Sequence, residues 1–149
     1  MTDGRNDGSG GGRAGGRCAC GGVRFVATLP PRFVAHCHCE NCRRAHGAAF
    51  VTWAGFREAA FRLDDPEGLV RAFASDTSAR RRFCSRCGTP MLYDGPRWPG
   101  EVHVAVALFD DDLGVAPKAH VYADRAPSWC PIADALPRLG GASGTEPLD

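Results

Sequence analysis

The stretch Cys37-His38-Cys39-Glu40-Asn41-Cys42 decides how the chain is interpreted, because it places three cysteines within six residues. Two more clusters flank it, Cys18-Ala19-Cys20 before it and Cys84-Ser85-Arg86-Cys87 after it. Only Cys130 of the eight cysteines stands apart. In a secreted chain these cysteines would suggest disulfides, whereas clusters of this kind in a reducing compartment indicate bound metal. The spacing favours metal.

Length and composition predict one soluble globular domain. The chain has 149 residues, of which 44% are hydrophobic, and a formal net charge of +1. Such a charge gives no long-range attraction to nucleic acid or to an anionic membrane, so we expect neither as a partner. The longest apolar run, Val102–Phe109, is too short to span a bilayer. Since the N-terminus lacks the apolar core of a signal peptide, we expect a cytoplasmic protein.

The two ends of the chain differ in composition from its middle. Residues 1–16 contain seven glycines and almost no large apolar side chain, so they predict a disordered tail. The composition of residues 140–149 predicts a second disordered tail. The folded domain is therefore expected to span residues 17–139.

Between these ends the pattern predicts short strands and little helix. Apolar and polar residues alternate over Val23–Thr28, and turn residues separate further short apolar runs. We expect Ala49–Ala54 to form a strand that stops at Gly55, and Val102–Phe109 to form another. One helical turn over Asn41–His46 and one short helix over Pro131–Leu139 complete the prediction. The fold class is therefore mostly β.

Strand geometry predicts which side chains of each cluster lie together. Side chains alternate between the faces of a strand, so the two sulfurs of Cys18–Cys20 would project to one side, as would those of Cys37 and Cys39. His36, His38 and Glu40 would then face away, which argues against His38 as a metal ligand. The C-x-x-C pair of Cys84 and Cys87 fits a tight turn, because Gly88 permits positive φ.

Seven clustered cysteines suffice for one closed zinc site with three sulfurs left over. Zinc in structural sites takes four tetrahedral ligands, whereas reactive zinc keeps three protein ligands and one open position. Spacing alone leaves the division unresolved. Cys18 and Cys20 could share a zinc ion with Cys39 and Cys42, or with Cys84 and Cys87.

Three motifs in order resemble a known family, that of the glutathione-dependent formaldehyde-activating enzymes, which shares its domain with centromere protein V. The motifs are Cys18–Phe25, Cys37–Arg44 followed by Gly47–Phe50, and Phe83–Pro90, and the later His120-Val121-Tyr122 and Trp129 also fit. The resemblance covers roughly residues 17–139. It implies an Mss4-like, zinc-stabilised β-sheet fold (a β-tent) and two zinc ions per chain.

The same resemblance implies how the cysteines are divided. It assigns the structural zinc to four ligands: Cys18, Cys20, Cys84 and Cys87. It assigns the second zinc to Cys37, Cys39 and Cys42, which leaves one position for a small thiol such as glutathione. These three cysteines are thus the predicted catalytic centre.

A zinc ion held by three thiolates suits sulfur chemistry better than activation of water. We therefore expect a carbon–sulfur lyase that forms or cleaves hemithioacetals, the adducts of a thiol and an aldehyde. His46, four residues after Cys42, is the first candidate for proton transfer, and the other candidates are Glu40, Glu101, His103 and His120. The alternative is a zinc-stabilised binding module without catalysis, of the centromere protein V type.

Overall fold

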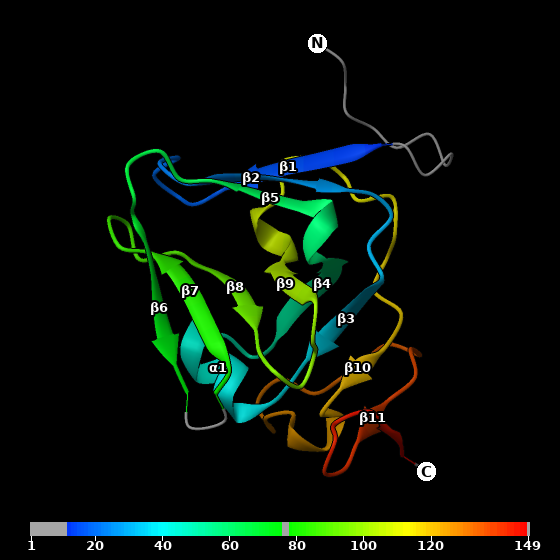
Figure 1. Cartoon of the computed structure of the whole chain (residues 1–149). Helices are drawn as coiled ribbons and strands as arrows, with labels where there is room; N and C mark the ends of the chain where they lie inside the picture. The colour runs from blue at the N-terminus through cyan, green and yellow to red at the C-terminus, as the bar shows by residue number, and fades with distance from the viewer. Residues whose placement is uncertain (1–11, 76–77, 149) are drawn as a thin grey trace. The chain divides into compact units, whose positions relative to one another are not determined.

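The computed structural model describes residues 12–75 and 78–148, and this part of the chain is mostly β (Figure 1). It contains one α-helix, α1 (Glu40–His46), among twelve strands. The predicted fold class is therefore confirmed. The chain divides into two compact units, one formed by residues 12–32 and 54–116 and the other by residues 33–53 and 117–148.

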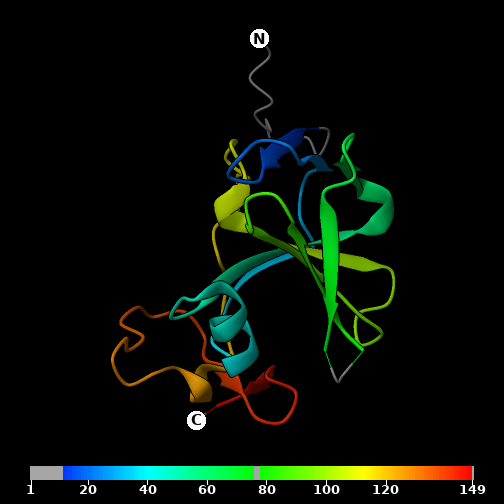
Figure 2. The ribbon, with the colours of Figure 1, turned by 90° about the vertical axis from the view of Figure 1, so that its left-hand side faces the viewer.

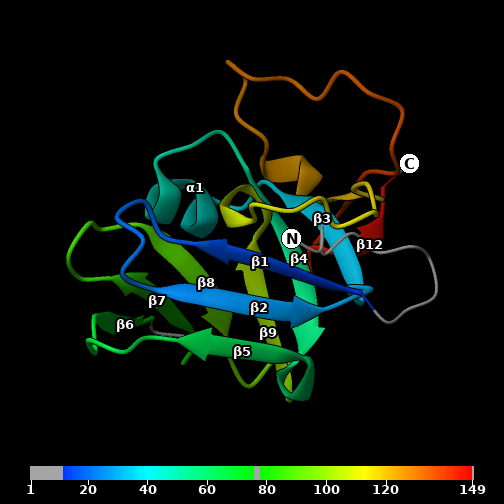
Figure 3. The same cartoon turned by 90° about the horizontal axis from the view of Figure 1, so that it is seen from above.

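The first unit contains two sets of hydrogen-bonded strands. One is an antiparallel sheet in the order β1-β2-β5, whose strands lie side by side in Figure 3. In the other, the order is β4-β9-β8-β7-β6. The bounds are β1 (Arg13–Arg17), β2 (Arg24–Thr28), β4 (Val51–Arg57), η1 (Glu58–Ala60), β5 (Phe61–Asp64), β6 (Val70–Ala74), β7 (Arg80–Cys84), β8 (Pro90–Asp94), β9 (Glu101–Ala105) and η2 (Val106–Leu108).

In the second unit, β3 pairs in parallel with β10. A small antiparallel pair, β11 and β12, lies near the C-terminus. The bounds are β3 (Phe33–Cys37), β10 (His120–Val121), η3 (Ala123–Arg125), β11 (Leu139–Gly140) and β12 (Glu146–Pro147). The predicted helical turn at residues 41–46 is confirmed by α1, which ends at Gly47 in the left-handed region (φ 61°).

The predicted N-terminal tail is wrong from residue 13 onward, because β1 pairs with β2 along its whole length. Ala14 is fully buried opposite Ala27. A Cβ at Gly16 would overlap the carbonyl oxygen of Leu108 and the ring of Phe25, so this glycine serves close packing. Residues 1–11, the remainder of the predicted tail, lie outside the described part of the chain.

Three other predictions differ from the structure. β4 continues through Gly55, whose carbonyl accepts a hydrogen bond from the Arg32 amide (2.7 Å). The strand at Val102–Phe109 ends at Ala105 and continues as the 3-10 turn η2. The predicted C-terminal tail contains β12 and part of β11.

The helix predicted at Pro131–Leu139 is also wrong, since residues 131–138 are irregular and form an orange loop in Figure 2. The Asp134 carboxylate accepts a hydrogen bond from the Leu136 amide (3.0 Å). Such a local bond competes with the hydrogen bonds of a helix, and Pro137 inside the predicted segment interrupts a helix further.

The aromatic core of the first unit should contribute strongly to its stability. The Phe25 side chain is 1% exposed, and its ring packs edge-on against Phe109 with centroids 5.0 Å apart. We expect Phe25→Ala to lower the free energy of unfolding by about 3–5 kcal/mol, because it opens a cavity. The matched control is Phe73→Ala, at a side chain that is 63% exposed, with an expected change of about 0.5 kcal/mol or less. Equal losses in urea unfolding would contradict this assignment of the core.

A pH-dependent contribution to stability is expected from Asp65, which closes the turn between β5 and β6. Its carboxylate accepts hydrogen bonds from the amides of Leu69 (2.8 Å) and Val70 (3.0 Å), and the bond from Val70 is the largest cause that lowers the pKa of Asp65. Because the folded pKa is depressed, the stabilisation is full above the unfolded pKa of about 3.9 and is lost as the pH falls through the folded value. The Tm difference between wild type and Asp65→Asn should therefore shrink below pH 4, and a constant difference would contradict the assignment.

Candidate metal centres

Four cysteines of the first unit meet at two neighbouring turns. Cys18 and Cys20 lie in the turn between β1 and β2, where the Gly21 amide donates to the Cys18 carbonyl (3.0 Å). This corrects the prediction that the pair lies on a strand: Gly21 has φ 78°, and the chain reverses there. Cys84 ends β7, and the predicted turn to Cys87 is confirmed by the bond from the Gly88 amide to the Cys84 carbonyl (2.7 Å).

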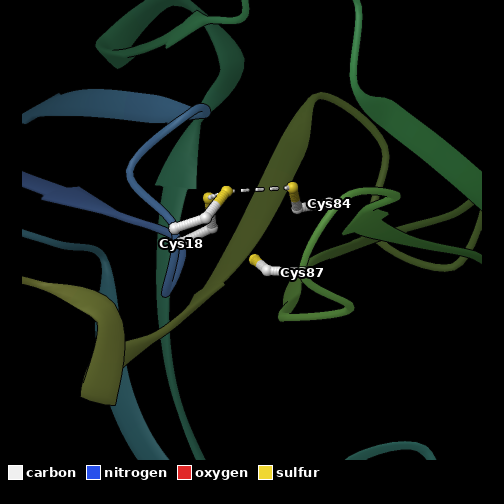
Figure 4. A group of neighbouring side chains, drawn as sticks. Cys18, Cys84 and Cys87 are labelled. Carbon is white, nitrogen blue, oxygen red and sulfur yellow. Dashed lines mark hydrogen bonds between the residues drawn. The ribbon is translucent and has the colours of Figure 1, made fainter.

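The sulfurs of these four residues lie within 4.8 Å of one another. The Sγ atoms of Cys18 and Cys20 are 3.6 Å apart, and those of Cys20 and Cys84 are 3.9 Å apart. Figure 4 shows the side chains of Cys18, Cys84 and Cys87 turned toward a common space. A tetrahedral zinc ion with Zn–S bonds of about 2.3 Å requires sulfurs about 3.8 Å apart. The donor set and its spacing thus fit a closed four-sulfur metal site.

The surroundings of this cluster favour the thiolate form at its two exposed sulfurs. The Thr89 hydroxyl, 3.1 Å from the Cys87 sulfur, lowers the pKa of Cys87 to about 5. The Arg86 guanidinium, whose Nε donates to the Cys20 sulfur (3.4 Å), lowers the pKa of Cys20. Burial instead raises the pKa of Cys84 to about 11. A bound cation would favour the thiolate form of the buried sulfur as well.

The second cluster lies where β3 passes into α1. Cys37 is the last residue of β3, Cys39 is the N-cap of α1, and Cys42 lies in the first helical turn. The Cys39 sulfur accepts a hydrogen bond from the Cys42 amide (3.3 Å), which caps the first turn of α1. All three sulfurs lie within 4.8 Å of one another. Cys37 and Cys42 are buried, and Cys39 is half-buried.

The surroundings of Cys37 favour its protonated thiol. Hydrogen bonds with Cys39 and then with Cys42, followed by burial, raise the pKa of Cys37. A soft divalent cation would replace the thiol protons, because thiolates are its preferred ligands. No fourth cysteine, histidine or acidic side chain joins the group within residues 12–75 and 78–148. The residues therefore fit a metal held by three protein sulfurs.

The structure also resolves the grouping that spacing left open. Cys18 and Cys20 group with Cys84 and Cys87, and the alternative pairing with Cys39 and Cys42 is not formed. Cys130 lies outside both clusters and is half-buried.

Histidines of the second unit form a stacked and hydrogen-bonded group. His38 Nε2 and His120 Nδ1 are 2.8 Å apart, and His120 Nε2 lies 2.8 Å from Asp134 Oδ1. The His36 ring stacks on His120 with centroids 4.9 Å apart, and its Nδ1 bonds the Thr52 hydroxyl (2.8 Å). Burial is the main cause that lowers the pKa of His38, to about 4, and of His36.

His38 lies outside the group of sulfurs, in agreement with the prediction that it faces away from them. The role of Asp134 was not predicted, because nothing in its local sequence indicates a contact with His120, which lies fourteen residues earlier.

The other candidates for proton transfer lie in different surroundings. His46 is in the last turn of α1 and packs edge-on against Trp53, with centroids 5.2 Å apart. Glu40 accepts a hydrogen bond from Arg125 (3.1 Å). The catalytic role of His46 stays a prediction.

Glu101 and His103 belong to the first unit, where they bond each other (3.0 Å). Arg32 lies 3.4 Å from Glu101. Burial lowers the pKa of His103, and these contacts describe a core histidine with its own partner.

Comparison with known proteins settles the family. The family model of the glutathione-dependent formaldehyde-activating enzymes matches residues 13–125. The chain belongs to this family. A Halomonas elongata protein that carries the family's name is 32% identical over 133 residues, which cover 78% of this chain and 79% of that protein. The resemblance drawn from the cysteine motifs is therefore confirmed.

Two further proteins are similar to this chain. An uncharacterized lyase of Schizosaccharomyces pombe is 24% identical over 119 residues, covering 80% of this chain and 85% of that protein. The crystal structure of a Rhodobacter sphaeroides protein matches with a TM-score of 0.56 at 29% identity, and the match covers 69% of this chain and 91% of that one. In the described part of the chain, no helix has the length and apolar character needed to cross a bilayer.

Proposed function

We propose that the protein is a zinc-dependent carbon–sulfur lyase that acts on adducts of an aldehyde with glutathione or a similar small thiol. One observation carries this proposal: Cys37, Cys39 and Cys42 converge without a fourth protein ligand in the described residues. Sites with three protein ligands are typical of reactive zinc, whereas closed sites are typical of structural zinc. The family and the lyase name of the yeast relative support the proposal.

The two clusters would have different tasks. Cys18, Cys20, Cys84 and Cys87 would hold a structural zinc ion that stabilises the first unit. Cys37, Cys39 and Cys42 would hold the second zinc ion. Two zinc ions per chain are therefore expected. None of the eight cysteines forms a disulfide, which suits a reducing compartment, the cytoplasm.

The reaction is the reversible addition of a thiol to an aldehyde. In the forward direction a C–S bond forms, the carbonyl double bond becomes a single bond, and the thiol proton ends on the new hydroxyl; cleavage is the reverse. When bound, zinc supplies Lewis-acid stabilisation of the sulfur as a thiolate. Cys39 is the half-buried member of its cluster, so it lies on the side from which a thiol can enter. His46 is the proposed proton-transfer group.

Cobalt substitution tests the proposal, because cobalt at a thiolate site has a visible spectrum that changes with its ligands. Adding glutathione to the cobalt-loaded protein should change the spectrum in a saturable way, and Cys42→Ser should abolish the change. Cys130→Ser, outside both clusters, is the control and should respond like wild type. A full complement of metal whose spectrum does not respond to thiol would contradict the enzyme and favour the non-catalytic module.

A further inference from the structure

A chain of hydrogen bonds runs from the surface of the second unit to the residue between Cys37 and Cys39. The Asp134 side chain is 50% exposed, and its two oxygens lie 2.8 and 3.1 Å from His120 Nε2. His120 Nδ1 is 2.8 Å from His38 Nε2. Both imidazoles are buried, with His38 2% exposed. Neither the metal centres nor the proposed proton transfer uses this chain.

The order of donors and acceptors along the chain follows from its exposed end. A carboxylate only accepts, so His120 donates from Nε2 to Asp134. With its proton at Nε2, His120 accepts at Nδ1 from the Nε2–H of His38. His38 is thereby held in one tautomer, with its lone pair at Nδ1, an atom that is buried without a hydrogen-bond partner. One carboxylate therefore fixes the orientation of two rings.

The same segment is held by its backbone. The amides of His36 and His38 donate to the carbonyls of Ala119 (3.0 Å) and Val121 (3.1 Å), in the parallel pairing of β3 with β10. Arg43 Nε donates to the His38 carbonyl (3.3 Å). The backbone of His38 is thus fixed within the segment that carries Cys37 and Cys39 on either side of it.

We propose that Asp134, acting through His120, is a positioning residue that fixes His38 and thereby the three-sulfur centre of Cys37, Cys39 and Cys42. This inference rests on the proposed metal at that centre. Groups outside the ligand shell that orient it typically change metal affinity about 10–100-fold, and a chain of two rings should act at the lower end of this range.

Three variants test the inference. Asp134→Ala removes the acceptor, and Asp134→Asn keeps an acceptor oxygen of the same shape. The matched control is Asp124→Ala, because Asp124 is also an exposed carboxylate of the second unit and accepts a bond from the Gly141 amide (3.1 Å). The first readout is the NMR signals of the imidazole N–H protons. The second is the rate at which each of two bound zinc ions is released to a chelator.

In Asp134→Ala we expect the N–H signals of both His38 and His120 to be lost or shifted. Zinc release from the three-cysteine centre should be about 10-fold faster, while release from the four-cysteine centre is unchanged. Asp134→Asn and Asp124→Ala should resemble wild type in both readouts. Any of three results would overturn the inference. They are unchanged N–H signals in Asp134→Ala, equally accelerated zinc release at both centres, and an Asp134→Asn variant that behaves like Asp134→Ala.

The failure of the proposed function would be recognised separately. Wild-type protein that binds a single zinc ion would refute the second metal centre. The imidazole signals would then still decide whether Asp134 orders the two histidines, because they are observed without reference to metal.

Discussion

Replacement of Cys84 by serine is expected to abolish the cooperative unfolding transition of the first unit. Cys84 is fully buried, its sulfur lies 3.9 Å from that of Cys20, and its backbone bonds Thr89 and Gly88. A serine hydroxyl is a poor ligand for a soft metal, so the four-sulfur site would lose its ion. Binding of a structural zinc ion supplies about 10–16 kcal/mol, whereas the whole stability of a domain is about 5–15 kcal/mol. The loss should therefore exceed what the core can compensate.

Thermal unfolding followed by circular dichroism measures this effect, together with the zinc content of each protein. Cys84→Ser should bind one zinc ion fewer than wild type and show no sharp melt. A strong chelator should produce the same result in wild type. Cys130→Ser is the matched control, since Cys130 belongs to neither cluster, and it should keep both zinc ions and its Tm. A cooperative melt in zinc-depleted Cys84→Ser at the wild-type Tm would show that the fold does not depend on this site.

Replacement of Cys42 by serine is expected to remove activity while the protein stays folded. Cys42 is buried, and its sulfur lies within 4.8 Å of those of Cys37 and Cys39. Lewis-acid stabilisation by a metal contributes several kcal/mol to a transition state. Since about 1.4 kcal/mol corresponds to a factor of ten in rate, the loss in kcat/KM should be about 100-fold or more.

The assay is the interconversion of formaldehyde, glutathione and their hemithioacetal, followed by NMR exchange. Asn41→Ser is the matched control, because Asn41 is the preceding, exposed residue of the same helix. It should keep full activity and both zinc ions. Activity of Cys42→Ser within a factor of three of the control would place the chemistry away from these sulfurs.

Local spacing was sufficient to predict the turn at Cys84–Cys87 and the only α-helix of the described residues, but it placed Cys18 and Cys20 on a strand instead of in a turn. The turn at Cys84–Cys87 needs positive φ where Gly88 stands, and α1 ends where Gly47 permits a left-handed residue. Strand alternation predicted that His38 would face away from Cys37 and Cys39, and its side chain indeed bonds His120. Each of these features depends on residues at most a few positions apart.

Features that depend on distant partners were missed. β1 was predicted to belong to a disordered glycine-rich tail, because the atoms that require Gly16, the Phe25 ring and the Leu108 backbone, are distant in the sequence. Spacing did not show which cysteine pairs lie together. The two turns that meet are far apart in the sequence, since Cys20 and Cys84 are separated by 64 positions. Asp134 was missed for the same reason. Pairings across the chain are set by tertiary packing, which local propensity does not encode.

The central claim is that three cysteines hold a zinc ion that can still accept the sulfur of a thiol. X-ray absorption at the zinc edge, combined with metal analysis, tests it most directly. We expect two zinc ions per chain and a rise in the mean number of sulfurs bound to each zinc ion when glutathione is added. The rise should be absent in Cys42→Ser. A single zinc ion per chain, or two ions whose sulfur number does not change with glutathione, would contradict it.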